Sequence, residues 1–152
     1  MSIVTTMVDL PGCKGRELGR SEWVEVTQER VGTFADATGD HQWIHVDAER
    51  ATRESPFGGP IAHGYLTLSL LIPLWSQILT VTDAAMFVNY GLNKVRFPAP
   101  VPVGGKIRLI ATLADVGEVS GGLQLTIGAV IELEGSDKPV CVAEPVFRVY
   151  GG

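Results

Sequence analysis

One stretch of the sequence, from Ile61 to Leu79, is almost uniformly apolar and restricts what the chain can fold into. A helix that spans a membrane needs about 20 such residues in a row. This stretch is interrupted by a histidine, a glycine, a proline and a glutamine (His63, Gly64, Pro73 and Gln77), and no basic cluster stands at either end. The sequence therefore predicts an apolar helix buried inside the protein, shortened or kinked at Pro73, and no membrane span.

The residues after this stretch alternate between apolar and polar, which is typical of antiparallel strands with one face toward a core. The alternation is cleanest from Leu123 to Leu133, and it recurs from Ile107 to Leu113 and from Val140 to Tyr150. A sheet with one polar face needs an apolar element over its other face, and the apolar helix needs a cover. We therefore predict an α+β protein in which a curved antiparallel sheet wraps around one long hydrophobic helix, which is the hot-dog fold.

Two local features refine this prediction. Between Met86 and Phe97 the alternation slips by one position near residues 91–93, which indicates a β-bulge in that strand. Ahead of the apolar stretch, Thr27 is placed to cap a helix that Gly39 ends, and Asp47 is placed to cap a second helix over residues 48–53. Residues 40–46 between these helices are expected to form a loop, and Pro60 is expected to mark the start of the apolar helix.

The composition excludes several classes of protein. With 152 residues, 45% of them hydrophobic, the chain is expected to form a single domain over residues 1–152. Its net charge of −5 argues against a nucleic-acid-binding protein, which would carry a basic surface. Cys13 and Cys141 match no zinc motif, and the first dozen residues do not resemble a signal peptide, so a cytoplasmic protein with reduced thiols is expected. No nucleotide-binding glycine motif is present, and no cofactor is expected.

All three histidines, His41, His45 and His63, lie close together in the sequence with several acidic residues among them. Asp40 and His45 have the residue types of an acid/base pair that grips one water molecule. A metal site is a second interpretation, but position 42 is Gln where a metalloprotease helix requires Glu, and no third ligand has a suitable spacing, so no metal is expected. In a third interpretation Asp40 only ends a helix, and the histidines are structural.

The run from Phe34 to Asp47, followed by Pro60-Ile61-Ala62-His63-Gly64, resembles the hydratase-2 motif of the MaoC-like dehydratases, the (R)-specific enoyl-CoA hydratases. The resemblance rests on Gly39-Asp40, on His45 at the required spacing and on the downstream Ile-Ala-His-Gly. It extends from about Gly12 to Tyr150. One departure concerns the Asn-Pro of the family, which is Gln42-Trp43 in this chain and puts the loop geometry and substrate preference in question.

The resemblance implies reversible syn addition of water to a trans-2-enoyl-CoA, or to the corresponding acyl-carrier-protein thioester, which gives a (3R)-hydroxyacyl product. It implies that Asp40 and His45 hold and activate the water, and the sequence leaves open which of them is the base. It also implies that the backbone N–H of Gly64, near the start of the apolar helix, stabilises the enolate-like oxygen of the thioester.

Four further residues have two interpretations each, and Gln42 is a further possible contact for the substrate. His63 is either a third catalytic residue or a packing residue at the start of the helix. Trp43, beside Gln42, either lines the acyl pocket or covers the loop, and Lys94 and Arg96 either bind CoA phosphates or are only solvated.

Two other functions remain open, because the hot-dog fold also supports acyl-CoA thioesterases and non-catalytic subunits of heteromeric dehydratases. The presence of both Asp40 and His45 favours hydration over these alternatives. The unpaired edge strand of such a sheet, together with the resemblance, predicts a homodimer.

Overall fold

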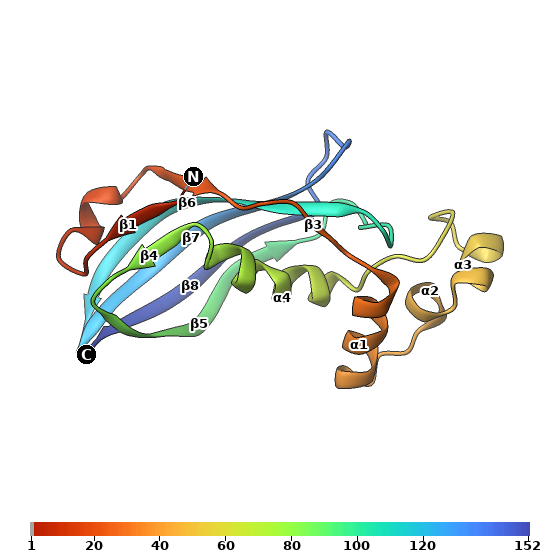
Figure 1. Cartoon of the computed structure of the whole chain (residues 1–152), viewed down its shortest axis with the longest axis horizontal. Coiled ribbons are helices and arrows are strands. Elements are labelled where there is room, and N and C mark those ends of the chain that lie inside the picture. The colour runs from red at the N-terminus through yellow and green to blue at the C-terminus, as the bar shows by residue number, and fades with distance from the viewer. Residues whose placement is uncertain (1) are drawn as a thin grey trace.

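The computed structural model describes residues 2–152 and consists of one large sheet, one central helix and a helical segment beside them (Figure 1). The elements in chain order are β1 (Ile3–Thr5), a 3₁₀ helix η1 (Leu10–Cys13), β2 (Glu17–Arg20), β3 (Val24–Glu25), α1 (Gln28–Thr38), α2 (Trp43–Val46), α3 (Ala48–Glu54), α4 (Gly64–Trp75), β4 (Leu79–Val81), β5 (Ala84–Arg96), β6 (Lys106–Val119), β7 (Gly122–Leu133) and β8 (Cys141–Gly151).

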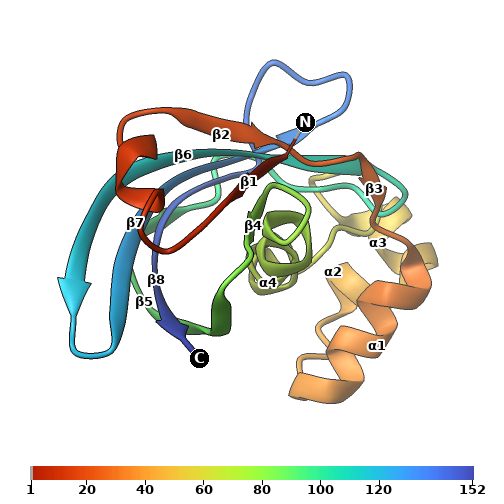
Figure 2. The same ribbon diagram turned by 60° about the vertical axis from the view of Figure 1, so that its left-hand side comes forward.

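The large sheet has the strand order β2-β6-β7-β8-β5, and the short β3 also pairs with β6. Every pairing in it is antiparallel, and the sheet curves around α4 (Figure 2). The alternation predicted from the sequence is confirmed, because Leu109, Leu113, Leu125 and Ile131 are fully buried. The intervening residues of β7 are only partly covered. The sheet therefore has one apolar face, and that face holds the core.

Helix α4 fills the concave side of this sheet. Its buried side chains include Leu66, Leu70, Leu71 and Leu74, and each fully buried leucine contributes about 1.5–3 kcal/mol through the hydrophobic effect. The helix ends at Trp75, two residues after Pro73, as the sequence predicted. None of the described helices has the length and apolar character that a membrane span requires.

Strand β5 forms the long edge of the sheet and pairs with β8. The predicted bulge is confirmed, since the register shifts between Asn89 and Gly91 and again between Leu92 and Val95. The expectation that this strand buries an apolar face in the core is wrong for most of its length. Met86, Tyr90 and Leu92 are about half exposed, because beyond β5 no described strand continues the sheet.

Helices α1, α2 and α3 lie together beside one end of α4 and outside the curved sheet (Figures 1 and 2). The predicted caps are confirmed, because the hydroxyl of Thr27 accepts from the N–H of Arg30 and the carboxylate of Asp47 accepts from the N–H of Arg50. Residues 40–46 are not all loop, since 43–46 form a short helix.

The path into α4 also differs from the expectation. Pro60 does not begin the helix, which starts at Gly64, because Ile61 first forms a β-bridge with Pro102. Beyond the other end of α4, β4 pairs in parallel with β1 in a separate two-stranded sheet that the sequence pattern did not indicate.

Candidate active site

Asp40 stands where α1 ends. Gly39 adopts the left-handed conformation with φ of 82°, and its N–H donates to the carbonyl of Ala35, so the chain leaves the helix axis at this point. The carboxylate of Asp40 is exposed and accepts a long hydrogen bond of 3.4 Å from the N–H of Gln42. The end of α1 therefore places the Asp40 carboxylate on a short loop, where the N–H of Gln42 holds it.

His45 is held in place by the backbone of the segment around Ile61. Its ring is buried, and Nδ1 lies 2.7 Å from the carbonyl oxygen of Ile61. A carbonyl oxygen can only accept, so Nδ1 carries the proton and Nε2 of the neutral ring is left with a lone pair. The carbonyl of Ile44 accepts from the N–H of Ile61, which ties the same two segments together. This arrangement fixes the ring and leaves Nε2 able to accept a hydrogen bond.

His63 is the residue that precedes α4, and its ring is also buried. Nε2 lies 3.0 Å from the backbone oxygen of Asp40, so it donates to that carbonyl. The ring is stacked on His45, with centroids 3.9 Å apart and planes inclined by 25°, and it also contacts Phe34 at 4.8 Å. The structure therefore brings together two histidines that α3 and a loop separate in the sequence.

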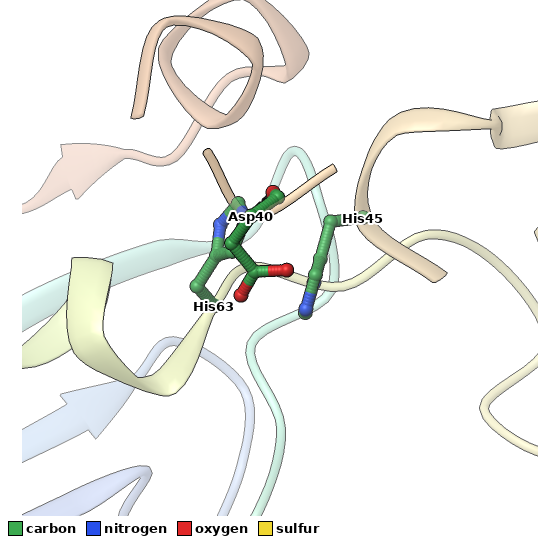
Figure 3. A group of neighbouring side chains, drawn as sticks. All are labelled: Asp40, His45 and His63. Atoms are coloured by element: carbon green, nitrogen blue, oxygen red, sulfur yellow. Dashed lines mark hydrogen bonds between the residues drawn. The ribbon is translucent and has the colours of Figure 1, made fainter. Parts of the chain in front are cut away.

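Asp40, His45 and His63 form one cluster, in which each residue offers a ligand atom within 4.8 Å of the others (Figure 3). These distances alone would suit a metal ion. However, the lone pair of an imidazole lies in the plane of its ring, and two nearly parallel rings stacked at 3.9 Å do not direct their lone pairs at one point. The geometry is better suited to holding a water molecule between a carboxylate and an imidazole nitrogen.

Gly64 is the first residue of α4, so its backbone N–H has no acceptor within its own helix. A groove of about 400 Å³ begins beside it and is lined by residues that include Phe57, Ile61, Thr67 and Phe97. The ring of Phe97 packs on Gly64 so closely that an added Cβ would lie 3.1 Å from it. This contact could not be predicted from the sequence, because Gly64 and Phe97 are far apart along the chain.

The pair Gln42-Trp43, which departs from the family motif, begins α2. Gln42 is the residue before the first turn, and the ring of Trp43 lies under the guanidinium of Arg50 at 4.2 Å. Arg50 in turn bonds Glu54. Trp43 is therefore fixed against α3 and forms part of the surface beside His45.

Lys94 and Arg96 both lie on the edge strand β5. The ammonium group of Lys94 is 3.5 Å from the carboxylate of Glu144, and the guanidinium of Arg96 donates to the carbonyl of Val95. Arg96 directly precedes Phe97, the residue that packs on Gly64. Neither basic group belongs to the cluster of Asp40, His45 and His63.

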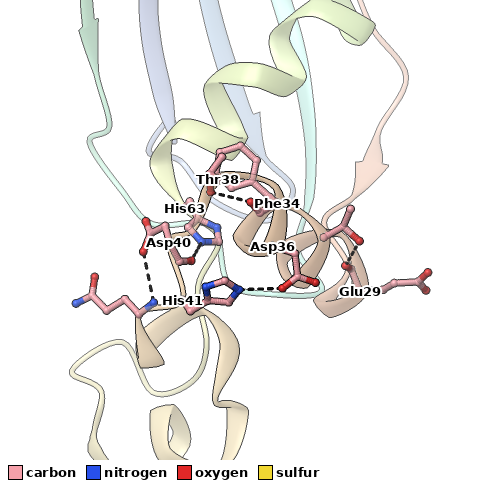
Figure 4. A network of polar contacts seen from close by, with 9 residues as sticks. Glu29, Phe34, Asp36, Thr38, Asp40, His41 and His63 are labelled. Carbon is pink, nitrogen blue, oxygen red and sulfur yellow. Dashed lines mark hydrogen bonds and ion pairs between the residues drawn. The ribbon is translucent and has the colours of Figure 1, made fainter.

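His41 points away from this cluster despite its place in the sequence. Its Nε2 lies 2.8 Å from the carboxylate of Asp36 on the exposed side of α1 (Figure 4). Figure 4 shows the neighbouring Asp40 turned the other way, toward His63. Phe34 and the carbonyl of Ile61 are the contributors to the site that sequence reasoning missed, and the carbonyl has no side-chain signature that could have revealed it.

Comparisons with known proteins identify relatives of this chain. A family model described as MaoC like domain matches residues 11–133. The 3-hydroxyacyl-thioester dehydratase Z of Mycobacterium tuberculosis strain H37Rv is 52% identical over 149 residues, which cover 97% of this chain and 98% of that protein.

Solved structures resemble the whole chain. The monoamine oxidase regulatory protein from Archaeoglobus fulgius has a TM-score of 0.79 at 22% identity and covers 100% of this chain and 99% of its own. An (R)-hydratase from A. caviae has a TM-score of 0.68 at 24% identity, with 85% and 91% covered. The ChsH1-ChsH2 complex from Mycobacterium tuberculosis has a TM-score of 0.70 at 13% identity, with 90% and 97% covered. At these identities the likenesses show a shared fold, and they include a complex of more than one chain.

Proposed function

We propose that this protein, a member of the MaoC-like domain family, hydrates trans-2-enoyl-CoA reversibly to (3R)-hydroxyacyl-CoA. It is a thioester hydratase/dehydratase with the hot-dog fold. The observation that carries the proposal is the approach of the Asp40 carboxylate to the imidazole of His45, whose Nδ1 is engaged by Ile61. The remaining nitrogen, Nε2, is free to exchange a proton with a water held against the carboxylate.

In the proposed reaction, Asp40 and His45 hold one water molecule at Cβ of the bound enoyl thioester. One of the pair takes a proton from the water while the hydroxide adds to Cβ, and a proton is delivered to Cα. Both additions occur on one face, because both groups lie on the same side of the substrate. Dehydration is the same path reversed, so no external oxidant, reductant or cofactor is required.

As Cβ is attacked, negative charge develops on the carbonyl oxygen of the thioester. The N–H of Gly64 is proposed to donate to this oxygen, and its position at the N-terminus of α4 favours negative charge. The groove that begins at Gly64 offers space for the thioester. Gly64 is partly exposed and has no side chain, so the substrate is proposed to approach its N–H on the side that the Phe97 ring does not cover.

The residues that contact the rest of the substrate are proposed from their positions beside the site. Gln42 and Trp43 are proposed to contact substrate beside His45, and Arg96 and Lys94 are proposed to meet the CoA phosphates beyond Phe97. An acyl-carrier-protein thioester presents the same enoyl group and phosphopantetheine arm. Rates measured with the same enoyl chain on CoA and on acyl-carrier protein would distinguish the two carriers.

The protein is proposed to act as a cytoplasmic single-domain homodimer. Support for the dimer comes from β5, which pairs with β8 on one side and, within residues 2–152, with no strand on the other. Met86, Tyr90 and Leu92 leave apolar surface exposed along this strand, and such edges are covered in stable proteins. The two buried free thiols, Cys13 and Cys141, are compatible with a reducing compartment.

A spectrophotometric assay tests the function. Purified protein mixed with crotonyl-CoA and a series of longer enoyl-CoA substrates should remove the enoyl absorbance, and chiral analysis should identify the (3R) product. Release of free thiol in place of hydration would indicate an acyl-CoA thioesterase. A protein that neither hydrates the enoyl-CoA nor releases free thiol would be a non-catalytic subunit. That result, or thiol release without hydration, would refute the proposal.

A further inference from the structure

The ring of His63 is a buried polar group that the proposed reaction does not use. Only 3% of its surface is exposed, yet it is not part of the water-binding pair. Buried polar groups are costly unless they are hydrogen-bonded, and within residues 2–152 Nδ1 has no hydrogen-bond partner at all. An apolar residue of similar shape would avoid this cost, so the contacts that the ring does make require an explanation.

The first contact holds the backbone of Asp40. Nε2 of His63 donates to the Asp40 carbonyl at 3.0 Å and joins residues that are 23 positions apart. Asp40 lies on an exposed loop, and among residues 2–152 its carboxylate accepts only the long bond from Gln42. The bond from His63, the residue directly before α4, therefore connects this loop to the start of the central helix.

The second contact supports His45. The bond from Nδ1 to Ile61 fixes one edge of the His45 ring, but it leaves the ring free to rock about that edge. The His63 ring covers one face of it at a centroid distance of 3.9 Å, and Phe34 covers His63 in turn. One side chain thus contacts both members of the acid/base pair.

We propose that His63 is a positioning residue, which aligns Asp40 through its backbone carbonyl and His45 through ring stacking, so that both meet the same water. This inference rests on the proposed hydration reaction. Alignment matters because a misplacement of about 1 Å can cost about 100-fold in rate.

Two substitutions separate the contacts. His63→Phe retains an aromatic ring against His45 and removes the donor to Asp40, whereas His63→Gln places an amide N–H near the position of Nε2 and removes the ring. We expect His63→Phe to lower kcat by about 10- to 100-fold with KM changed by less than about threefold. His63→Gln should recover part of this loss. His41→Phe is the matched control, since His41 points away to Asp36, and it should stay within about twofold of the wild type.

A double-mutant cycle tests whether His63 acts through Asp40. In an Asp40→Asn background the group that is positioned has lost its function, so adding His63→Phe should lower kcat by less than about threefold. An equal loss in both backgrounds would overturn the proposal. So would a His63→Phe variant with a lower melting temperature and normal kcat per folded molecule, because that result would leave His63 as a packing residue.

A measurement without substrate distinguishes failure of this inference from failure of the proposed function. NMR of ¹⁵N-histidine-labelled wild-type protein should show His63 as the Nε2–H tautomer, and this signal should be insensitive to the Asp40→Asn change, which leaves the backbone carbonyl in place. An Nδ1–H tautomer would overturn the positioning role whatever the activity. A wild-type protein that hydrates no enoyl thioester but shows the expected tautomer would refute the function alone.

Discussion

Each of the two buried imidazoles of the site has one nitrogen bonded to a backbone carbonyl, and the two carbonyls belong to different segments. His45 donates to Ile61, and His63 donates to Asp40. The chain segments that carry the proposed site residues are thereby connected to each other through the two histidine side chains. Substitutions in the site are expected to have separate effects on chemistry and on stability, depending on which nitrogen they replace.

Replacement of the acid/base pair shows this separation. Asp40→Asn, His45→Asn and His45→Gln should each lower kcat/KM by at least about 100-fold, because each removes a group that transfers a proton. The amide of His45→Asn can still donate to Ile61, whereas His45→Gln leaves that carbonyl without its donor, at a cost of about 1–3 kcal/mol. Thermal melts and turnover measured together should therefore show His45→Asn to be inactive and the more stable of the two histidine variants. Hydration at near wild-type rates in all three would remove the pair from the mechanism.

The Gly64→Ala variant is affected by the packing of Phe97. A methyl group would lie 3.1 Å from that ring. The crowding is expected to offset the gain in stability that the higher helix propensity of alanine would otherwise give. We expect turnover to fall about 100- to 1000-fold through loss of access to the N–H, with a modest drop in melting temperature. The double variant Gly64→Ala/Phe97→Leu should recover the stability and leave turnover low. Recovery of both would show that Gly64 serves packing alone.

At the scale of elements, the sequence predicted those structures whose causes are local. Thr27, Gly39 and Asp47 set the bounds of α1 and α3 through their own side chains or backbone freedom. The alternation of β6 and β7 and the end of α4 just after Pro73 likewise follow from residues within each element.

Other elements depend on partners far away in the sequence. The strand β1 exists because Ile3 pairs with Leu79, and Gly64 is crowded because Phe97 reaches it. The short helix α2 was missed because four residues are too few to show a period. Asp40 and His45 were predicted from their residue types and from the resemblance to the hydratase-2 motif. The sequence could not show that the ring of His63 packs between His45 and Phe34 of α1, because these residues are far apart along the chain.

Strand β8 begins with a thiol that makes the pH dependence of stability measurable. Burial raises the pKa of Cys141 from 9.0 to about 11. The unfolded chain therefore loses this proton at lower pH than the folded one, and stability contributed by the neutral thiol should fall as the pH rises from about 9 to 11. Urea unfolding at several pH values in this range should show a steeper loss for the wild type than for Cys141→Ala. Parallel curves would mean that the thiol titrates alike in both states.

At the scale of the whole molecule, the exposed edge of β5 bears on assembly. We expect sedimentation to give twice the chain mass of 16.3 kDa at micromolar concentration. Introducing charge with Met86→Lys and Leu92→Lys should shift the protein toward the monomer, because both side chains lie on this strand. Val8→Lys, at an exposed position after β1, is the matched control and should leave the mass unchanged. A wild-type species of single-chain mass would rule out the dimer.

The pairing of β2 with β6 also determines the order in which the protein can be completed on the ribosome. Glu17 pairs with Thr112, about a hundred positions later, so β2 has no partner until most of the chain has been translated. At about 5–20 residues per second, the wait lasts several seconds. Throughout that time Leu10 and Leu18, which are buried in the finished protein, remain exposed on the nascent chain. Chaperones that bind apolar segments during translation would then contact the N-terminal third of this protein first and release it only when β6 emerges.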